Sequence, residues 1–103
     1  MTDLEDRRKG FEAKWAHDAE LRFQVEARRD RMLGAWAAAQ KGLTGQAADD
    51  FATSVIAADL QEPGDEDVFR KLRAELDPAN FPDAVIRAQM AEALAQAVKE
   101  LTK

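Results

Sequence analysis

The sequence has no cysteine, and among its 103 residues it has one histidine and one serine. The absence of cysteine excludes disulfides, thiolate metal ligands and a cysteine nucleophile. No apolar run approaches the roughly 20 residues that a membrane-spanning helix needs. The opening residues, MTDLEDRRKG, lack the apolar stretch of a secretory signal. We therefore expect a cytoplasmic protein without direct membrane insertion.

Glycine and proline are also scarce, with five and three residues, whereas alanine is abundant. This composition favours helix along almost the whole chain. Charged residues make up 34% of the sequence, and the net charge is −5. Both signs are interspersed, which is typical of a solvated helical surface and gives no general attraction to nucleic acid.

Catalytic and metal-binding constellations are missing. His17 stands alone, whereas a zinc site needs several nitrogen or sulfur ligands. Ser54 lacks the glycines of a nucleophile elbow, and no glycine-rich phosphate loop occurs. We predict no enzyme, no catalytic residue and no metal site. His17 is interpreted as a surface residue, with tuning of function by pH as the alternative.

The acidic run GDEDV invites a calcium interpretation. An EF-hand loop needs ligands at alternate positions and a late glutamate, whereas Asp65, Glu66 and Asp67 are consecutive. Negative charge at the start of a helix is favoured by the helix dipole. We therefore expect these carboxylates to cap a helix.

Apolar periodicity and turn residues predict an all-α protein, a small four-helix bundle with a long first helix. Gly42 suits the left-handed position after that helix, Thr44 suits the N-cap of the next, and Pro82 suits the start of the last. The expected helices are about Asp3–Lys41, Thr44–Leu60, Asp65–Leu76 and Pro82–Thr102.

The first helix is expected to bury both flanks after about Leu21, including a second flank with Phe23 and Ala27. Charged residues interrupt its apolar face at Asp18, Arg22 and Arg29. The core of the later helices is expected to contain Phe51, Val55, Val68, Phe69, Leu72, Leu76, Val85, Ile86, Met90, Ala93, Leu94, Ala97, Val98 and Leu101.

The stretch DRRKGFEAKWAHDAE is more than half charged, yet it carries Phe11 and Trp15 one helical turn apart. It buries too little to offset a backbone entropy cost of about 1–2 kcal/mol per residue, and short isolated helices are marginal in water. We expect residues 1–19 to project from a bundle of residues 20–103, to be mobile, and to become helical in a partner's groove. Docking of the rings onto the protein's own core is the alternative.

Three segments in this order, DRRKGFEAKWAHDAELRFQVEARRDRMLGAWAA, GLTG and ADLQEPGDEDVFRKL, resemble the zeta-subunit family of inhibitors of the alphaproteobacterial F-type ATP synthase. The resemblance implies a four-helix bundle whose N-terminal segment inhibits ATP hydrolysis by the catalytic head. The implied partners are the alpha, beta and gamma subunits, on the cytoplasmic side of the membrane-bound synthase.

Carried onto this chain, the resemblance places partner-binding residues in the N-terminal segment. They are Leu4, Arg7, Arg8, Lys9, Phe11, Glu12, Lys14 and Trp15. The family is also associated with ADP or ATP as a regulatory ligand, although no cofactor is required. On charge grounds alone, the nucleotide-binding candidates are Arg22, Arg28 and Arg29.

Other interpretations remain open at this point. By composition alone, the arginine cluster fits a solvated helix face with partners such as Glu26 better than a nucleotide site. A helical adaptor that binds another partner through the same N-terminal stripe shares every argument from composition. A DNA-binding domain is disfavoured by the net acidity.

Overall fold

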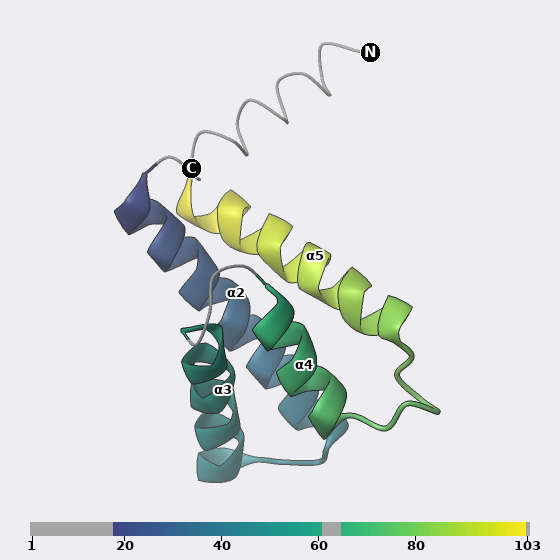
Figure 1. The fold of residues 1–103 in the computed structure, drawn as a ribbon. Coiled ribbons are helices and arrows are strands. Elements are labelled where there is room, and N and C mark those ends of the chain that lie inside the picture. Colours follow the sequence, from purple (N-terminus) through teal and green to yellow (C-terminus); the bar gives the residue numbers. More distant parts are fainter. Residues whose placement is uncertain (1–17, 61–64, 103) are drawn as a thin grey trace.

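The computed structural model describes residues 18–60 and 65–102, and this part of the chain is helical without strands. The helices are α2 (Ala19–Gln40), α3 (Gly45–Asp59), α4 (Glu66–Glu75) and α5 (Asp83–Leu101). Helix α2 is the longest, and α3 and α5 form their most extensive contacts with it (Figure 1). Helix α4 packs against α3 and α5. The predicted all-α class and small four-helix bundle are confirmed.

The start of the first helix differs from the prediction. Helix α2 begins at Ala19, because Asp18 has an extended backbone (φ −97°, ψ 107°). The Asp18 carboxylate accepts a hydrogen bond from the backbone N–H of Leu21 at 3.0 Å, which satisfies one free donor of the first turn. The prediction that one helix runs through Asp18 is therefore wrong. Its earlier part, residues 3–17, lies outside the described residues.

The turn between α2 and α3 follows the prediction at Gly42, which has a φ of +73°. The backbone N–H of Leu43 reaches back to the carbonyl oxygen of Ala38 at 2.9 Å, so the turn satisfies a carbonyl at the helix end. Thr44 occupies the N-cap position of α3, but its side chain makes no capping hydrogen bond. The position of Thr44 at the start of α3 was therefore predicted correctly, whereas a capping hydrogen bond from its side chain does not form.

Two groups of buried apolar side chains form the core. The larger group joins all four helices and contains Leu33, Ala37, Ala38, Phe51, Val55, Val68, Leu72, Leu76, Ile86 and Met90. The smaller group joins the start of α2 to the end of α5 through Val25, Ala97 and Val98. Most predicted core positions are thus confirmed, while Phe69, Ala93, Leu94 and Leu101 are half-buried.

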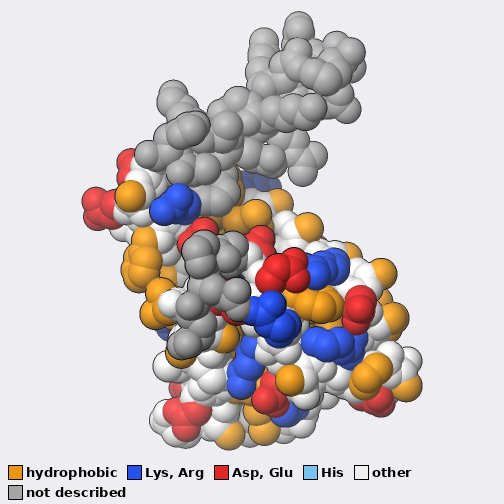
Figure 2. Space-filling view, in the orientation of Figure 1, with side chains coloured by type: hydrophobic (Ala, Val, Ile, Leu, Met, Phe, Trp, Pro, Cys, Tyr) orange, Lys and Arg blue, Asp and Glu red, His pale blue; other side chains and the backbone are white. Residues whose placement is uncertain are grey.

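Two predicted core positions are exposed instead. Phe23 is 60% exposed, so the prediction that α2 buries both flanks after Leu21 is wrong at this side chain. Val85, near the start of α5, is 39% exposed. Among the described residues, acidic and basic side chains lie next to one another on the face shown in Figure 2 rather than in separate fields.

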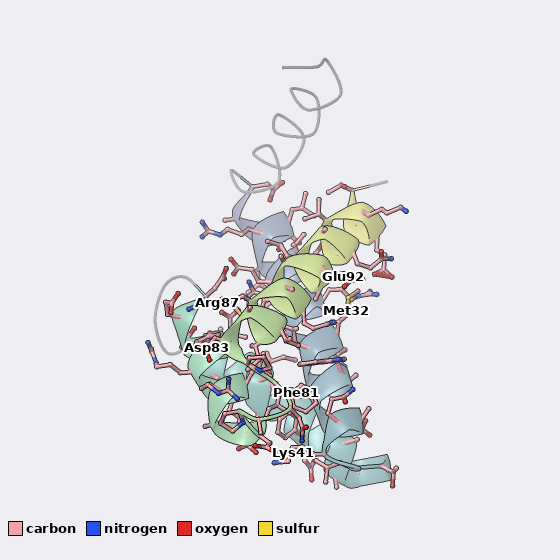
Figure 3. The ribbon with its side chains drawn as sticks, turned by 90° about the vertical axis from the view of Figure 1, so that its right-hand side faces the viewer. Met32, Lys41, Phe81, Asp83, Arg87 and Glu92 are labelled. Carbon is pink, nitrogen blue, oxygen red and sulfur yellow. The ribbon has the colours of Figure 1, made fainter. Side chains whose placement is uncertain are left out.

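Side-chain contacts tie α5 and the loop before it to the other helices (Figure 3). The Arg87 guanidinium donates to both carboxylate oxygens of Glu66 at 3.0 Å and lies 3.8 Å from the centroid of the Phe69 ring. The rings of Trp36 and Phe81 meet edge to face, with centroids 5.7 Å apart. These contacts fix α5 relative to α4, and the loop relative to α2.

Gly34 lies where α2 and α3 approach most closely. A Cβ atom added to Gly34 would lie 2.5 Å from the Cα atom and 2.8 Å from the Cβ atom of Ala52. A glycine inside a helix is ordinarily a weak point. In the structure its missing side chain permits the contact between the two helices.

We predict that Gly34→Ala lowers the free energy of unfolding by about 1–3 kcal/mol, because overpacking outweighs alanine's helix preference of about 1 kcal/mol. Urea unfolding followed by circular dichroism measures the change. Adding Ala52→Gly moves the methyl group across the contact and should recover part of the loss. Recovery should be partial, because the Cα atom of residue 52 would still lie 2.5 Å from the added methyl group. An unchanged free energy of unfolding in Gly34→Ala would contradict a direct steric clash.

Candidate functional site

The predicted inhibitory residues cannot be placed. Leu4, Arg7, Arg8, Lys9, Phe11, Glu12, Lys14 and Trp15 all lie outside the described residues, as does His17. Their role stays a prediction. The part of the chain that the structure describes is the bundle, beginning at Asp18.

The three arginines proposed for nucleotide binding are separated by the fold. Arg22 and Arg28 are exposed, and an Arg28 guanidinium nitrogen lies 3.7 Å from a carboxylate oxygen of Glu100. Arg29 is only 2% exposed and points into the bundle. The alternative interpretation of Arg29 as part of a solvated face is therefore wrong, and the three side chains do not form one cationic surface.

Arg29 is held by carboxylates from three elements. Its Nε atom donates to Asp30 on α2 at 3.0 Å, and its Nη1 atom donates to Asp65, just before α4, at 2.6 Å. Its Nη2 atom lies 3.3 Å from a carboxylate oxygen of Asp59, the last residue of α3. We call these four residues the Arg29 cluster. It fastens the end of α3 and the start of α4 to the middle of α2.

Asp65 does not play the capping role expected from the sequence. It occupies the N-cap position of α4, but its side chain makes no capping hydrogen bond and pairs with Arg29 instead. The Asp67 carboxylate accepts from the backbone N–H of Val68 at 2.9 Å. Both Glu66 and Asp67 lie in the first turn, where the helix dipole favours negative charge.

Asp30 is the most perturbed acid of the cluster. It is 1% exposed, and its Oδ2 atom has no hydrogen-bond donor. Burial raises the pKa of Asp30 from 3.8 to about 8, a hydrogen bond with Asp59 adds to the rise, and the Arg29 charge opposes it. Protonation of this carboxyl group would supply the proton that such a contact needs. It also reduces the excess of negative charge around the single guanidinium.

Within the described part of the chain, other groups show no arrangement for catalysis or metal binding. The Ser54 hydroxyl donates to the carbonyl oxygen of Phe51 at 2.6 Å. No group of three or more acidic or histidine side chains in residues 18–60 and 65–102 is arranged to hold a metal ion. None of the described helices is both long enough and apolar enough to cross a membrane.

The described part of the chain is thus a small helical bundle with a buried ionic cluster and mixed surface charge, a fold that does not by itself define a function. A family model described as ATPase inhibitor subunit zeta matches residues 1–100. The chain belongs to this family, which confirms the resemblance found in the sequence and makes the protein an ATPase inhibitor. The family also indicates an interaction with the F-type ATP synthase. A search of curated proteins finds no match.

Sequence reasoning missed the partners of Arg29. It noted that Arg29 interrupts an apolar face, but it assigned the residue to solvent or to a nucleotide. A charged residue in the middle of an apolar stripe signals a buried ion pair when acids lie at the ends of neighbouring helices. Asp59 and Asp65 satisfy this condition, and Asp30 follows Arg29 directly.

We predict that Arg29→Met lowers the free energy of unfolding by about 3–5 kcal/mol, because it leaves buried carboxylates without their cation. Arg28→Met, which removes an exposed guanidinium next to it, should change the value by less than about 1 kcal/mol. Urea unfolding of both variants at pH 7 makes the comparison. Equal effects at the two positions would contradict a structural role for the buried cation.

Proposed function

We propose that residues 1–19 inhibit ATP hydrolysis by wedging into a catalytic interface between the alpha and beta subunits, close to the gamma rotor. Residues 20–103 form the bundle that grips the catalytic head and acts as a steric stop. The site of action lies on the cytoplasmic side of the membrane-bound synthase. In this proposal the inhibitor supplies no chemistry of its own.

The observation that carries this proposal is the start of α2. Asp18 has an extended backbone and caps α2 with its own side chain, so the first turn of α2 has a cap that belongs to the described part of the chain. Residues of all four described helices build the core. This arrangement supports a division into a folded bundle and a preceding segment that is free to bind elsewhere.

The physical mechanism rests on how a rotary ATPase works. Its catalytic interfaces must open and close in turn, so a helix wedged into one of them holds that interface in a single state. Phe11 and Trp15, four residues apart, would be the apolar anchors of this helix. The surrounding Arg7, Lys9 and Glu12 would set its register and speed its encounter with the head through complementary charge.

Removal of residues 1–15 is expected to abolish inhibition while leaving the thermal unfolding midpoint of the bundle nearly unchanged. The measurements are ATP hydrolysis by the cognate catalytic head and circular dichroism of the truncated protein. A truncated protein that inhibits as strongly as the full chain would refute the wedge. If it binds the head without inhibiting, the bundle supplies the grip alone.

The double change Phe11→Ala with Trp15→Ala tests the anchors. Interface aromatic anchors typically contribute about 2 kcal/mol or more each, so the inhibitory affinity should fall by about 30-fold per ring. Helical content should hardly change. Loss of the fold would instead place the rings in the core. Full inhibition with both rings removed would refute their role as anchors.

We further propose that ADP or ATP, as a regulatory ligand, binds beside α2. A groove there is lined by Phe23, Ala27, Arg28, Arg31 and Leu101, among others. Guanidinium groups bind phosphate oxygens, and an exposed aromatic ring offers a surface for a base. Arg22 is exposed but does not line this groove, and the Arg29 guanidinium is already engaged by carboxylates.

Arg28→Gln is expected to weaken ADP binding at least about fivefold, because a charge-assisted hydrogen bond is worth about 1.5–3 kcal/mol. Lys99→Gln on α5, an exposed site outside the groove, makes the same charge change and serves as the control. Calorimetric titration of the full chain with ADP measures both. Unchanged binding in Arg28→Gln would exclude this groove.

A further inference from the structure

The Arg29 cluster holds more carboxylates than one cation can neutralise. Three carboxyl groups, those of Asp30, Asp59 and Asp65, face the single guanidinium of Arg29. The Asp65 side chain is half exposed, whereas those of Asp30 and Asp59 are 1% and 10% exposed. The imbalance therefore falls on the two buried acids.

The contact between the two buried acids requires a proton. The Oδ2 atom of Asp30 is enclosed and meets no donor. Carboxylate oxygens of Asp30 and Asp59 approach the same guanidinium nitrogen, Nη2 of Arg29, at 3.0 and 3.3 Å. Two ionised carboxylates would repel each other there, whereas one shared proton turns the contact into a hydrogen bond. We call Asp30 and Asp59 the carboxyl pair.

We propose that the carboxyl pair shares one proton in the folded bundle, and that loss of this proton above neutral pH weakens the attachment of α3 and α4 to α2. The pair is then a pH-sensitive fastening between helices. It is separate from the inhibitory segment and does not depend on how that segment acts.

Charged groups from the neighbouring elements favour a protonated pair. On α2, Glu26 lies near the cluster, and its own pKa is raised by burial and by the Asp59 charge. Asp65, before α4, adds a further negative charge. Arg29 opposes the pair directly, whereas Arg22 on α2 acts on Glu26 and Arg87 on α5 acts on Asp65. On α5, the core face is apolar at Ile86 and Met90. The surplus of negative charge around the pair therefore helps it to keep its shared proton at neutral pH.

The sign of the pH effect is set by the raised pKa of Asp30. In the unfolded chain this carboxyl group ionises near 3.8, whereas in the folded bundle it stays protonated up to about pH 8. Folding therefore takes up a proton between these values, and stability falls as pH rises through this range. The pKa values of Glu66 and Glu75 are lowered from 4.5, so these two groups change the stability only at pH values near and below 4.5. A window from about pH 5.5 to 8.5 therefore lies above the titrations of Glu66 and Glu75, whereas Glu26, whose pKa is raised, is present in every variant compared.

Solvent has a short route to the pair. A shallow pocket is lined by both carboxyl residues together with Phe23, Ile56 and Leu60. Phe23 and Leu60 are exposed, so the rim of this pocket faces water. The proton can therefore exchange without global unfolding, which a reversible response to pH requires.

Urea unfolding of the full chain between about pH 5.5 and 8.5 tests the proposal, with His17→Gln in every variant to remove the imidazole titration. The unfolding equilibrium constant should rise with pH, by up to about tenfold per unit. Asp30→Asn should remove most of this dependence, because an amide donates to Asp59 at every pH. Asp49→Asn, an exposed position on α3, should retain it. An equal slope in Asp30→Asn and Asp49→Asn overturns the proposal.

A second measurement needs no variant at the pair and covers the case in which Asp30→Asn does not fold. Carbon-detected NMR of the side-chain carboxyl groups gives the titration of Asp30 in the folded protein. A midpoint near 8, with amides at the α3–α4 end shifting or exchanging faster as it is passed, supports the fastening. A midpoint near 3.8, or a high midpoint without any response from those amides, refutes it.

Discussion

The buried guanidinium of Arg29 is the contact on which the arrangement of the helices depends. It reaches carboxylates on its own helix, at the end of α3 and at the start of α4, so one side chain sets where three elements meet. Apolar contacts alone would tolerate small rotations of α3 and α4 about α2. Hydrogen bonds to a planar guanidinium are directional, and buried carboxylates cannot be released without cost. The cluster therefore adds specificity to a core built from ordinary aliphatic packing.

Much of the fold could be predicted from the sequence because its signals are local. Gly42 and Pro82 mark helix ends through their own backbone preferences, and the apolar spacing of Val68, Leu72 and Leu76 needs no knowledge of neighbours. The break at Asp18 was missed because its carboxylate offers two outcomes, a solvated side chain within a helix or an N-cap. Tertiary packing contributes to the choice between these outcomes. The smaller core group packs the start of α2 against the end of α5, and such packing is not visible in the local sequence.

The site was harder to predict because its contacts are distant in sequence. Arg29 and Asp65 are 36 residues apart, with the whole of α3 between them. Asp65 was expected to cap α4 because aspartate is favoured at the N-cap. Phe23 was expected inside because aromatic residues on a helix usually are buried, and the structure leaves it exposed. Both errors have one cause. Local preference indicates which contacts Asp65 and Phe23 can make, whereas the tertiary neighbours decide which of these contacts form.

An inhibitor of this kind has two requirements that oppose each other. In the proposed mechanism, the N-terminal segment must be able to leave the bundle, whereas the bundle must resist the forces of a rotating machine. The N-cap at Asp18 meets the first requirement. Because α2 begins at Ala19, the cooperative helix does not extend to the residues before Asp18. The Arg29 cluster meets the second requirement. Arg29 lies on α2, the helix that Asp18 caps, and joins it to the end of α3 and the start of α4. A proton shared within the cluster would make this resistance adjustable without altering the segment, because the two lie in different parts of the chain.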